Sequence, residues 1–326
     1  MTVSVAVFFL GGTISMSGQG AGVVSRLDGD ELVAAVPQLA ELDVTLDVRD
    51  FRQLPSACLT FADIAELVAE ASSAVADGAA GIVVVQGTDT IEETSYLIDL
   101  LWDADAPIVV TGAMRKPSLA GADGPANLLA AVQVAVSARF CAMGALVAFN
   151  DEVHAARYVR KMHSTSPATF ASPNAGPVGL LVEGAPVLLM TPRRVALPPP
   201  VRALTARVGL LVMSLEDDGA LLDAAGNYDG LVIAGFGAGH VPSSLAERVG
   251  ELARRMPVVL ASRAGAGPVL NHTYGYAGSE TDLLARGLIG SGLLDAFKAR
   301  VLLRVLLSAG VDRPAITAAF AGAAGS

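Results

Sequence analysis

Short apolar runs alternate along the chain with longer stretches in which apolar residues recur every three or four positions. Apolar runs of about four to eight residues bounded by glycine or proline are typical of buried strands, and the longer period is typical of amphipathic helices. We expect strands at residues 3–10, 81–86, 108–111, 145–149, 208–213, 230–234 and 258–261, and helices at residues 63–76, 91–102, 127–137 and 244–255. Strands that alternate with helices in this way predict an α/β fold with parallel sheets.

One segment interrupts this alternation. Residues 191–206 contain four prolines and several arginines, which a compact parallel sheet would not accommodate, so we interpret them as a linker. We therefore predict a larger N-terminal domain at residues 1–190, with a parallel sheet and helices on both faces, and a smaller C-terminal α/β domain at residues 207–326. Open α/β sheets bind ligands beyond the carboxyl ends of their strands, so we expect the chemistry there.

Composition narrows the class of protein. Hydrophobic residues make up 52% of the 326 residues and charged residues only 17%, which excludes a disordered chain. With a net charge of −10 and few lysines, the chain lacks the basic face that binds nucleic acids. No stretch has the roughly 20 predominantly apolar residues of a membrane span, and no basic residue precedes the apolar start as in a signal peptide. We expect a cytoplasmic protein without nucleic-acid or membrane partners.

Cysteine and histidine are scarce. Cys58 and Cys141 each lie among apolar neighbours, and two cysteines are too few for a disulfide framework, so we predict that both are buried core thiols. The four histidines lack the paired spacing of zinc ligands. We therefore expect no metal and no other cofactor.

A double glycine ends the first predicted strand and is followed by a hydroxyl residue. Gly11 and Gly12 allow the chain to turn sharply and allow other groups to approach closely. Such a turn would leave the hydroxyl of Thr13 at the carboxyl end of the strand. Taken alone, the pattern is equally compatible with an ordinary turn.

A second polar turn follows the second predicted strand. Its segment QGTDT leads into a helix, and Thr90 with Glu93 has the Ser/Thr-x-x-Glu spacing of a capping box. Thr88 and Asp89 would then lie at a helix N-terminus, where a hydroxyl, a carboxylate and backbone N–H groups converge on a small ligand. The alternative is that Asp89 is only a turn or capping residue. Because Thr90 is predicted to cap the helix, Asp89 is not needed for that role, and a function for Asp89 is favoured.

Several motifs, in order along nearly the whole chain, resemble those of the bacterial-type L-asparaginase and glutaminase family. They are GGTIS at 11–15, QGTDTIEETSYLIDLL at 86–101, VVTGAMR at 109–115, GADGPANL at 121–128 and GFGAGHVP at 235–242. The resemblance implies an amidohydrolase that forms an acyl-enzyme on a threonine and acts on a small-molecule amide.

The resemblance implies catalytic roles for four residues. Thr13 matches the nucleophile, and Thr88 matches a second threonine linked to a lysine that can accept a proton, which aligns with Lys161. An unassisted hydroxyl is nearly inert at neutral pH and needs such a base. Asp89 matches the residue that pairs with the substrate α-ammonium. Without the resemblance, Lys161 would be interpreted as a surface charge.

The resemblance also implies a substrate-binding set. Ser56 matches the serine that holds the substrate α-carboxylate, and Glu280 lies where the family contributes a carboxylate from a neighbouring subunit. We therefore expect a homodimer or a homotetramer with the active site near a subunit interface. The full predicted set is Gly12, Ser56, Gly87, Thr88, Asp89, Ala113, Met114 and Glu280.

Backbone N–H groups near Thr13 and Ala113 are candidates for an oxyanion hole, a feature worth on the order of 3 kcal/mol per donor. Met114 and Arg115 follow in the same turn. They are as compatible with a core methionine and a solvated arginine as with ligand contact.

The chain departs from the family pattern in two places. The family's lid carries a tyrosine that hydrogen-bonds the nucleophile, whereas residues 15–30, which are rich in Gly and Ser and resemble a lid, contain no tyrosine. His240 stands where many members have asparagine. Three alternatives remain for the role of the missing tyrosine: Ser17, Ser25 or Arg26 takes it, a tyrosine from elsewhere (Tyr158, Tyr274 or Tyr276) moves in, or activation relies on Lys161 alone.

Two functions remain open at this point. The leading hypothesis is hydrolysis of the side-chain amide of asparagine, or of a related small amide or lactam. The second, motivated by the missing lid tyrosine, is a silent or slow binder of an amino acid or dicarboxylate. A transfer-RNA amidotransferase is disfavoured by the net charge, and a dinucleotide site by the G-x-G-x-G spacing at 235–239 in place of G-x-G-x-x-G.

Overall fold

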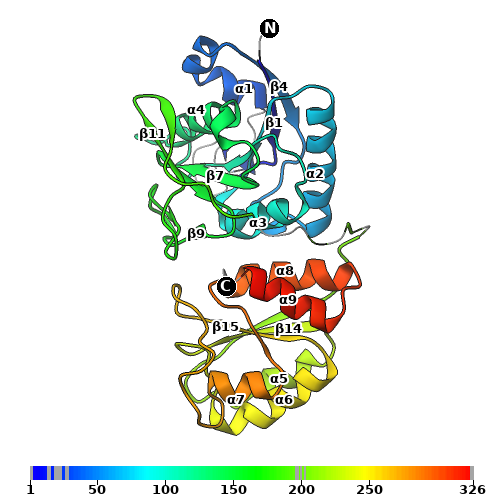
Figure 1. Ribbon diagram of the computed structural model, residues 1–326. Coiled ribbons are helices and arrows are strands. Elements are labelled where there is room, and N and C mark those ends of the chain that lie inside the picture. The colour runs from blue at the N-terminus through cyan, green and yellow to red at the C-terminus, as the bar shows by residue number, and fades with distance from the viewer. Residues whose placement is uncertain are drawn as a thin grey trace. The chain divides into compact units, whose positions relative to one another are not determined.

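The computed structural model describes residues 3–12, 16–17, 24–25, 29–194, 198, 200–201 and 203–323. The chain divides into two compact units, Met1–Arg194 and Val195–Ser326 (Figure 1). Arg194 Nη2 donates to the Trp102 carbonyl at 2.6 Å at the end of the first unit. The predicted linker at 191–206 spans the boundary, and its residues 195–197, 199 and 202 lie outside the described residues.

The described part of the N-terminal unit contains an eight-stranded sheet. Its strands lie in the order β12 (Ala185–Leu188), β11 (Gly179–Val182), β8 (Glu152–Ala155), β7 (Ala145–Phe149), β6 (Ile108–Thr111), β5 (Gly81–Val85), β1 (Val3–Phe9) and β4 (Val44–Asp50). Neighbours from β4 to β7 pair parallel, whereas the pairs β7–β8, β8–β11 and β11–β12 are antiparallel.

The predicted α/β fold is confirmed, but the sheet is mixed and wider than the apolar runs indicated. The predicted strands β1, β5, β6 and β7 are buried almost throughout. Strands β4 and β12 alternate between half-buried and exposed residues. Because a half-exposed strand has no continuous apolar run, the hydrophobic pattern did not predict these two edges.

Helices cover both faces of this sheet (Figure 1). They are α1 (Gly29–Ala34), α2 (Phe61–Ala76), α3 (Ile91–Leu101) and α4 (Gly124–Ala135). Val5 and Val7 of β1 share one hydrophobic core cluster with residues of α1 and α4. Because side chains alternate along a strand, the fully buried Phe8 points to the opposite face, where α2 and α3 pack.

Two helices begin earlier than the periodicity predicts. Thr60 caps α2: its hydroxyl accepts the Asp63 N–H at 3.1 Å, and the Asp63 carboxylate accepts the Thr60 N–H at 2.9 Å. This reciprocal capping box moves the start to Phe61. Helix α4 begins at Gly124 because Pro125 is tolerated in the first helical turn, where no N–H partner is needed.

The C-terminal unit repeats the strand–helix alternation. Its described sheet has the parallel order β13 (Val208–Val212), β14 (Gly230–Gly235), β15 (Val258–Ser262) and β16 (Ile289–Gly290). Its helices are α5 (Ala220–Ala225), α6 (Ala246–Arg255), α7 (Glu280–Ala285), α8 (Ala296–Ser308) and α9 (Arg313–Ala323). Ile233 of β14 shares a core cluster with residues of α5, α6 and α7, and α8 packs against β13, β14 and β15 (Figure 1).

Short elements complete the described part. They are β2 (Met16–Ser17), β3 (Val24–Ser25), β9 (Arg160–Lys161), β10 (Phe170–Ala171) and the 3-10 turns η2 (Pro37–Glu41), η3 (Ser56–Cys58), η4 (Thr88–Thr90), η5 (Ala138–Phe140) and η6 (Ser243–Leu245). Strand β9 pairs with β10, and β2 pairs with β3, in both cases antiparallel. In the part of the chain that the structure describes, no helix is both long and apolar enough to cross a lipid bilayer.

The prediction that both cysteines are buried is wrong. Cys58 and Cys141 are free thiols in exposed positions. Each lies at or just after a 3-10 turn in which another residue takes the inward position, Ser56 in one case and Phe140 in the other. Successive side chains of a 3-10 turn point about a third of a turn apart, so apolar neighbours in sequence do not place a residue in the core.

Candidate active site

The carboxyl ends of three neighbouring strands meet at one edge of the N-terminal sheet. Strand β5 lies between β1 and β6, and the register places Phe9 beside Val85 and Val85 beside Thr111. After β1 the chain adds β4 on one side and then β5, β6 and β7 on the other. Open α/β sheets bind ligands where the strand order reverses in this way, here between β1 and β5.

Two of the turns that follow these strands touch through glycine. Gly12 has a φ of +97°, and a Cβ atom added there would lie 2.3 Å from the Gly87 nitrogen. A Cβ at Gly87 would lie 2.8 Å from Ser56 Oγ. No larger residue fits either position without displacing its neighbour. The structure thus brings the predicted residues Gly12, Gly87 and Ser56 together, with Ser56 buried.

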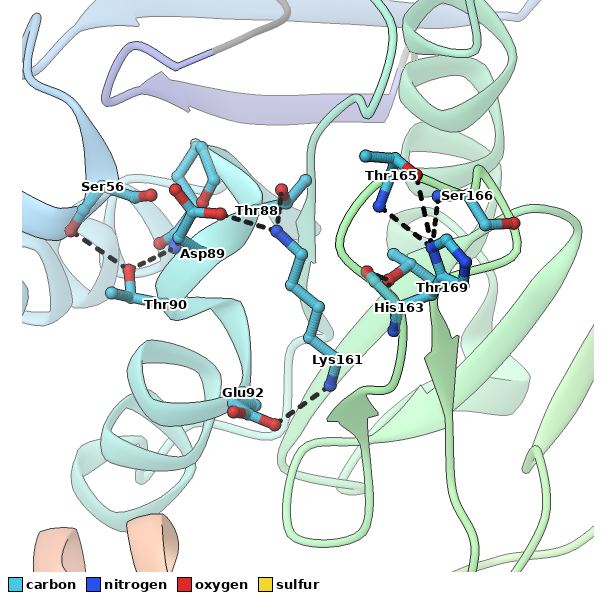
Figure 2. Close-up of polar contacts among 12 residues, drawn as sticks. Ser56, Thr88, Asp89, Thr90, Glu92, Lys161, His163, Thr165, Ser166 and Thr169 are labelled. Atoms are coloured by element: carbon cyan, nitrogen blue, oxygen red, sulfur yellow. Dashed lines mark hydrogen bonds and ion pairs between the residues drawn. The ribbon is translucent and has the colours of Figure 1, made fainter.

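Lys161 reaches the turn after β5 from strand β9 (Figure 2). Its Nζ donates to Thr88 Oγ1 at 2.8 Å and pairs with Asp89 Oδ1 at 2.6 Å. Thr88 is buried and the Lys161 side chain is 13% exposed, whereas the Asp89 side chain is 72% exposed. The lysine nitrogen is therefore held between a buried hydroxyl and a carboxylate that faces solvent.

The backbone of Lys161 is fixed on both sides of the residue. Its N–H donates to Glu92 Oε2 of α3 at 3.0 Å. On the other side, the N–H of the next residue, Met162, donates to the Thr169 carbonyl at 2.7 Å. Because the side chain starts from a fixed backbone, the direction in which its amine points is restricted.

The predicted capping box at the start of α3 is wrong. Thr90 occupies the N-cap position, but its side chain caps no backbone N–H. Its Oγ1 donates to the Ser56 carbonyl at 3.2 Å and accepts from the Gln86 amide at 3.3 Å. The reason is that η4 precedes the helix and gives Thr90 a ψ of 8° in place of the extended conformation of a capping residue. Because Thr90 does not cap the helix, the assignment of the cap to Thr90 no longer favours a function for Asp89. The ion pair between Asp89 and Lys161 favours that function instead.

The turn after β6 is held by polar side chains from the start of α4. The Asp123 carboxylate accepts the N–H groups of Met114 and Arg115 at 2.9 and 2.8 Å, and Asn127 Nδ2 donates to a carbonyl of the same turn at 3.0 Å. Ala113 is buried in this turn and Met114 is half-buried. The Met114 N–H is thus engaged within the protein.

In the C-terminal unit, the predicted residue Glu280 begins α7 and is fully buried. Its carboxylate accepts the backbone N–H groups of Thr273 and Tyr274 at 2.9 and 2.8 Å and lies 3.2 Å from His240 Nε2. Burial acts to raise the pKa of the Glu280 carboxyl, but these hydrogen bonds outweigh it and hold the pKa below its ordinary value. Glu280 is therefore an anion at neutral pH.

The predicted nucleophile Thr13 lies outside the described residues, as do residues 15, 18–23 and 26–28 of the predicted lid. Within that lid, the described backbone of β2 pairs with that of β3. Gly12, which directly precedes Thr13, is the last described residue of the first turn.

The Thr88–Lys161–Asp89 cluster has the groups needed to move a proton and to bind a cation. A hydroxyl bonded to an amine can pass a proton to it whenever the amine is neutral. The exposed Asp89 carboxylate has acceptor sites beyond the one used by Lys161, and these suit an ammonium group. Among the described residues, no cluster of three or more His, Cys, Asp or Glu side chains is placed to hold a metal ion.

Sequence reasoning missed four polar residues that hold the parts of the candidate site in place: Glu92 bonds the backbone of Lys161, Gln86 bonds Thr90, and Asp123 and Asn127 bond the turn after β6. All four lie inside the segments 86–101 and 121–128 that carry the family resemblance. A polar residue near a strand end gives no local signal of which distant N–H or carbonyl it binds.

Comparisons with known proteins bear out the resemblance. The family model "Asparaginase, N-terminal" matches residues 4–193, and "Glutaminase/Asparaginase C-terminal domain" matches residues 207–320. The chain is 36% identical to a probable L-asparaginase of Deinococcus radiodurans, over 97% of this chain and 96% of that one. It is 33% identical to L-asparaginase 2 of Escherichia coli K12, over 94% and 89% of the two chains.

Among solved structures, a probable cytoplasmic L-asparaginase from Campylobacter jejuni matches with a TM-score of 0.88 at 30% identity, over 98% of this chain and 99% of that one. Both units and nearly the full length of the chain are therefore accounted for by one family. The chain belongs to the bacterial-type asparaginase family and is an amidohydrolase of the kind that acts on linear amides.

Proposed function

We propose that this enzyme hydrolyses the side-chain amide of L-asparagine, or of a related small amide, through a covalent ester on Thr13. The observation that carries the proposal is the contact of Lys161 Nζ with Thr88 Oγ1 and Asp89 Oδ1 at the carboxyl end of β5. The relatives named L-asparaginase support asparagine as the first substrate to test.

The reaction has two halves with balanced proton transfers. Thr13 Oγ forms a bond to the amide carbonyl carbon and loses its proton, and the C–N bond then breaks so that ammonia leaves with that proton. Water next attacks the ester carbon, the bond to Thr13 Oγ breaks, and Thr13 regains a proton. The neutral amine of Lys161 takes up the water proton through the Thr88 hydroxyl, a role that contributes about 10²–10⁴-fold in comparable enzymes.

The other predicted residues bind the substrate. Asp89 pairs with the substrate α-ammonium, for which its largely exposed carboxylate is suited. The hydroxyl of Ser56 holds the α-carboxylate beside Gly87, and backbone N–H groups near Thr13 and Ala113 stabilise the developing oxyanion.

We also propose that the active enzyme is a homodimer or a homotetramer in which Glu280 of one copy completes the site of another. Its partner is a small-molecule amide and not a nucleic acid or a membrane. Its compartment is the cytoplasm, a proposal supported by the similarity to the probable cytoplasmic L-asparaginase from Campylobacter jejuni. Light scattering of the purified chain tests the assembly, and a monomer with full activity would contradict it.

Ammonia release tests the nucleophile. We expect Thr13→Ala to lose nearly all activity toward the best of L- and D-asparagine, glutamine, succinamate and small lactams, whereas Thr13→Ser retains part of it because it keeps a hydroxyl. Hydroxylamine added during turnover should trap the ester in the parent and not in Thr13→Ala. Release of ammonia by Thr13→Ala at the parental rate would show that Thr13 is not the nucleophile.

A second candidate function follows from residues 15–30, which contain no tyrosine. If the lid tyrosine is indispensable, the chain binds an amino acid or dicarboxylate without turnover. Calorimetry with aspartate beside the ammonia assay separates the two functions, because tight binding with no ammonia release from any amide supports the binder.

A further inference from the structure

A network of side-chain hydrogen bonds connects α3 with η3, the turn that contains Ser56. Gln86 directly follows β5 and is fully buried, and Thr94 of α3 is also buried. Thr94 Oγ1 lies 2.9 Å from Gln86 Oε1, and Gln86 Nε2 lies 3.3 Å from Thr90 Oγ1. Thr90 Oγ1 in turn lies 3.2 Å from the Ser56 carbonyl oxygen (Figure 2). The last bond joins positions 34 apart, so it links two separate segments of the N-terminal unit.

The acceptors in this network fix the direction of its hydrogen bonds. The Gly87 carbonyl lies 3.2 Å from Gln86 Nε2 and can only accept, so the amide nitrogen of Gln86 faces it and the amide oxygen faces Thr94. The second N–H of the same nitrogen donates to Thr90 Oγ1. The Ser56 carbonyl can also only accept, so the Thr90 hydroxyl uses its one proton there. Gln86 therefore orients the Thr90 hydroxyl toward Ser56.

The bond from Thr90 is one of two that tie η3 to the ends of neighbouring strands. Just before the turn, the Leu54 N–H donates to the Leu10 carbonyl at 3.0 Å, which ties the chain to the end of β1. Thr90 provides the corresponding tie to the turn that follows β5. The Ser56 side chain lies against Gly87 in that same turn. The place of the Ser56 hydroxyl beside Gly87 therefore depends on the Thr90 bond.

Packing alone does not account for these buried polar groups. Apolar side chains of the same shape at positions 86 and 94 would fill the space without the cost of removing an amide and a hydroxyl from water. They would not orient the Thr90 hydroxyl, because hydrophobic contact is non-directional. The network ends at the backbone of Ser56, a residue proposed to bind substrate, and not at the groups proposed to transfer protons.

We infer that Gln86, Thr90 and Thr94 are positioning residues that set the place of Ser56 and thereby the affinity for amides that carry an α-carboxylate. The inference rests on the proposed function, in which the Ser56 hydroxyl holds that carboxylate. The carboxylate takes no part in bond breaking and is bound alike in the ground state and in the transition state. Loss of the network should therefore raise KM and leave kcat near the parent.

The first experiment compares Thr90→Val with Thr90→Ser. Thr90→Val keeps the shape of the side chain and removes its donor, and the Ser56 carbonyl still accepts the Leu59 N–H at 3.1 Å, so the variant should fold, as a thermal melt can verify. We expect Thr90→Val to raise KM for L-asparagine about tenfold with little change in kcat, and to weaken L-aspartate binding by a similar factor in calorimetry. Thr90→Ser, which keeps the hydroxyl, should stay near the parent in both measurements.

The matched control is Thr317→Val, which removes a hydroxyl that donates to a backbone carbonyl within α9 at 3.0 Å. Its KM and its affinity for aspartate should be parental. Parental KM and parental aspartate affinity in Thr90→Val, or a fall in kcat without a rise in KM, would overturn the inference.

A double-variant cycle shows whether the network acts through Ser56. Ser56→Ala should raise KM, and adding Thr90→Val to it should change KM little further, because the hydroxyl that Thr90 positions is already gone. Factors that multiply in the double variant would overturn the inference. A raised KM in Ser56→Ala beside a parental KM in Thr90→Val would overturn the inference alone, whereas a parental KM in Ser56→Ala would overturn the proposed role of Ser56 as well.

Thr94→Val tests the far end of the network and takes the place of Thr90→Val if that variant does not fold. It removes the donor to Gln86 Oε1, so the amide is held by its two N–H bonds alone. We expect KM to rise about two- to fivefold with kcat near the parent, and the affinity for aspartate to fall by a similar factor. Parental values of both KM and aspartate affinity would overturn the inference.

Discussion

Replacing Lys161 should separate catalysis from stability. The lysine nitrogen contacts the Thr88 hydroxyl at 2.8 Å and the Asp89 carboxylate at 2.6 Å. If it accepts a proton during hydrolysis, Lys161→Met removes the base and lowers kcat by about 10²–10⁴-fold. The structure predicts that this loss comes with little unfolding.

The expected loss in the free energy of unfolding follows from the exposure of the two groups that Lys161 contacts. Asp89 is 72% exposed, so its carboxylate is hydrated when the lysine is gone, and an ion pair to such a group contributes about 0–1 kcal/mol. The buried Thr88 hydroxyl loses one partner, which costs about 1 kcal/mol. We therefore expect the free energy of unfolding to fall by no more than about 2 kcal/mol.

The assay is ammonia release under saturating substrate, with urea unfolding of the same preparations. Lys161→Arg keeps the positive charge but cannot give up its proton, so it should be nearly as inactive as Lys161→Met. Arg254→Met is the matched control, because it removes one exposed cation that lies 3.3 Å from Glu247 on α6. More than about a tenth of the parental kcat in Lys161→Met, or parental activity in Lys161→Arg, would refute proton acceptance by this lysine.

Two further predictions concern the free energy of unfolding, measured with urea. Gly12→Ala should lower it by more than about 3 kcal/mol, because the added Cβ collides with Gly87 and the positive φ is strained. Gly78→Ala, also at positive φ but with open space around it, should lower it by about 1–2 kcal/mol. Equal losses in the two variants would contradict the collision. Burial raises the pKa of Asp99 from 3.8 to about 6. Between these values the folded state keeps a proton that the unfolded state has lost. The free energy of unfolding should therefore fall by up to about 3 kcal/mol as pH rises from about 4 to 6. Asp99→Asn, which keeps an oxygen acceptor for the Ala145 N–H, should remove this slope; an unchanged slope in urea unfolding at pH 4.5 and 6.5 would assign it to another group.

The accuracy of the sequence-based elements depended on burial. Strands β5, β6 and β7 are buried on both faces, so their apolar runs are continuous and were predicted within one residue of their ends. Strand β4 is half-exposed and pairs with β1 at the sheet edge, so no run marked it. The capping box at Thr90 failed because η4 changes the backbone of the capping residue, which the spacing of side chains does not reveal.

The residues of the candidate site also differ in whether a local sequence signal predicted them. Thr88 and Asp89 were predicted from the strand that precedes them and the helix that follows, since both signals lie within a few residues. Lys161 was predicted through the resemblance alone, because its contact with Thr88 joins positions 73 residues apart. The contact between His240 and Glu280 likewise joins residues 40 positions apart.

The sequence by itself determined the alternation of strands and helices, the family, and the chemical groups at the strand ends, because hydrophobic runs and motifs depend on residues close together in the chain. Only the tertiary structure decided which of those groups meet. It placed Lys161 on Thr88 and Asp89 through the bond of its backbone to Glu92, directed Thr90 to Ser56 instead of a helix cap, and exposed both cysteines. Contacts of this kind depend on how distant segments pack. Hydrophobic burial drives that packing but is non-directional, so the apolar pattern of the sequence does not reveal which polar groups become hydrogen-bond partners.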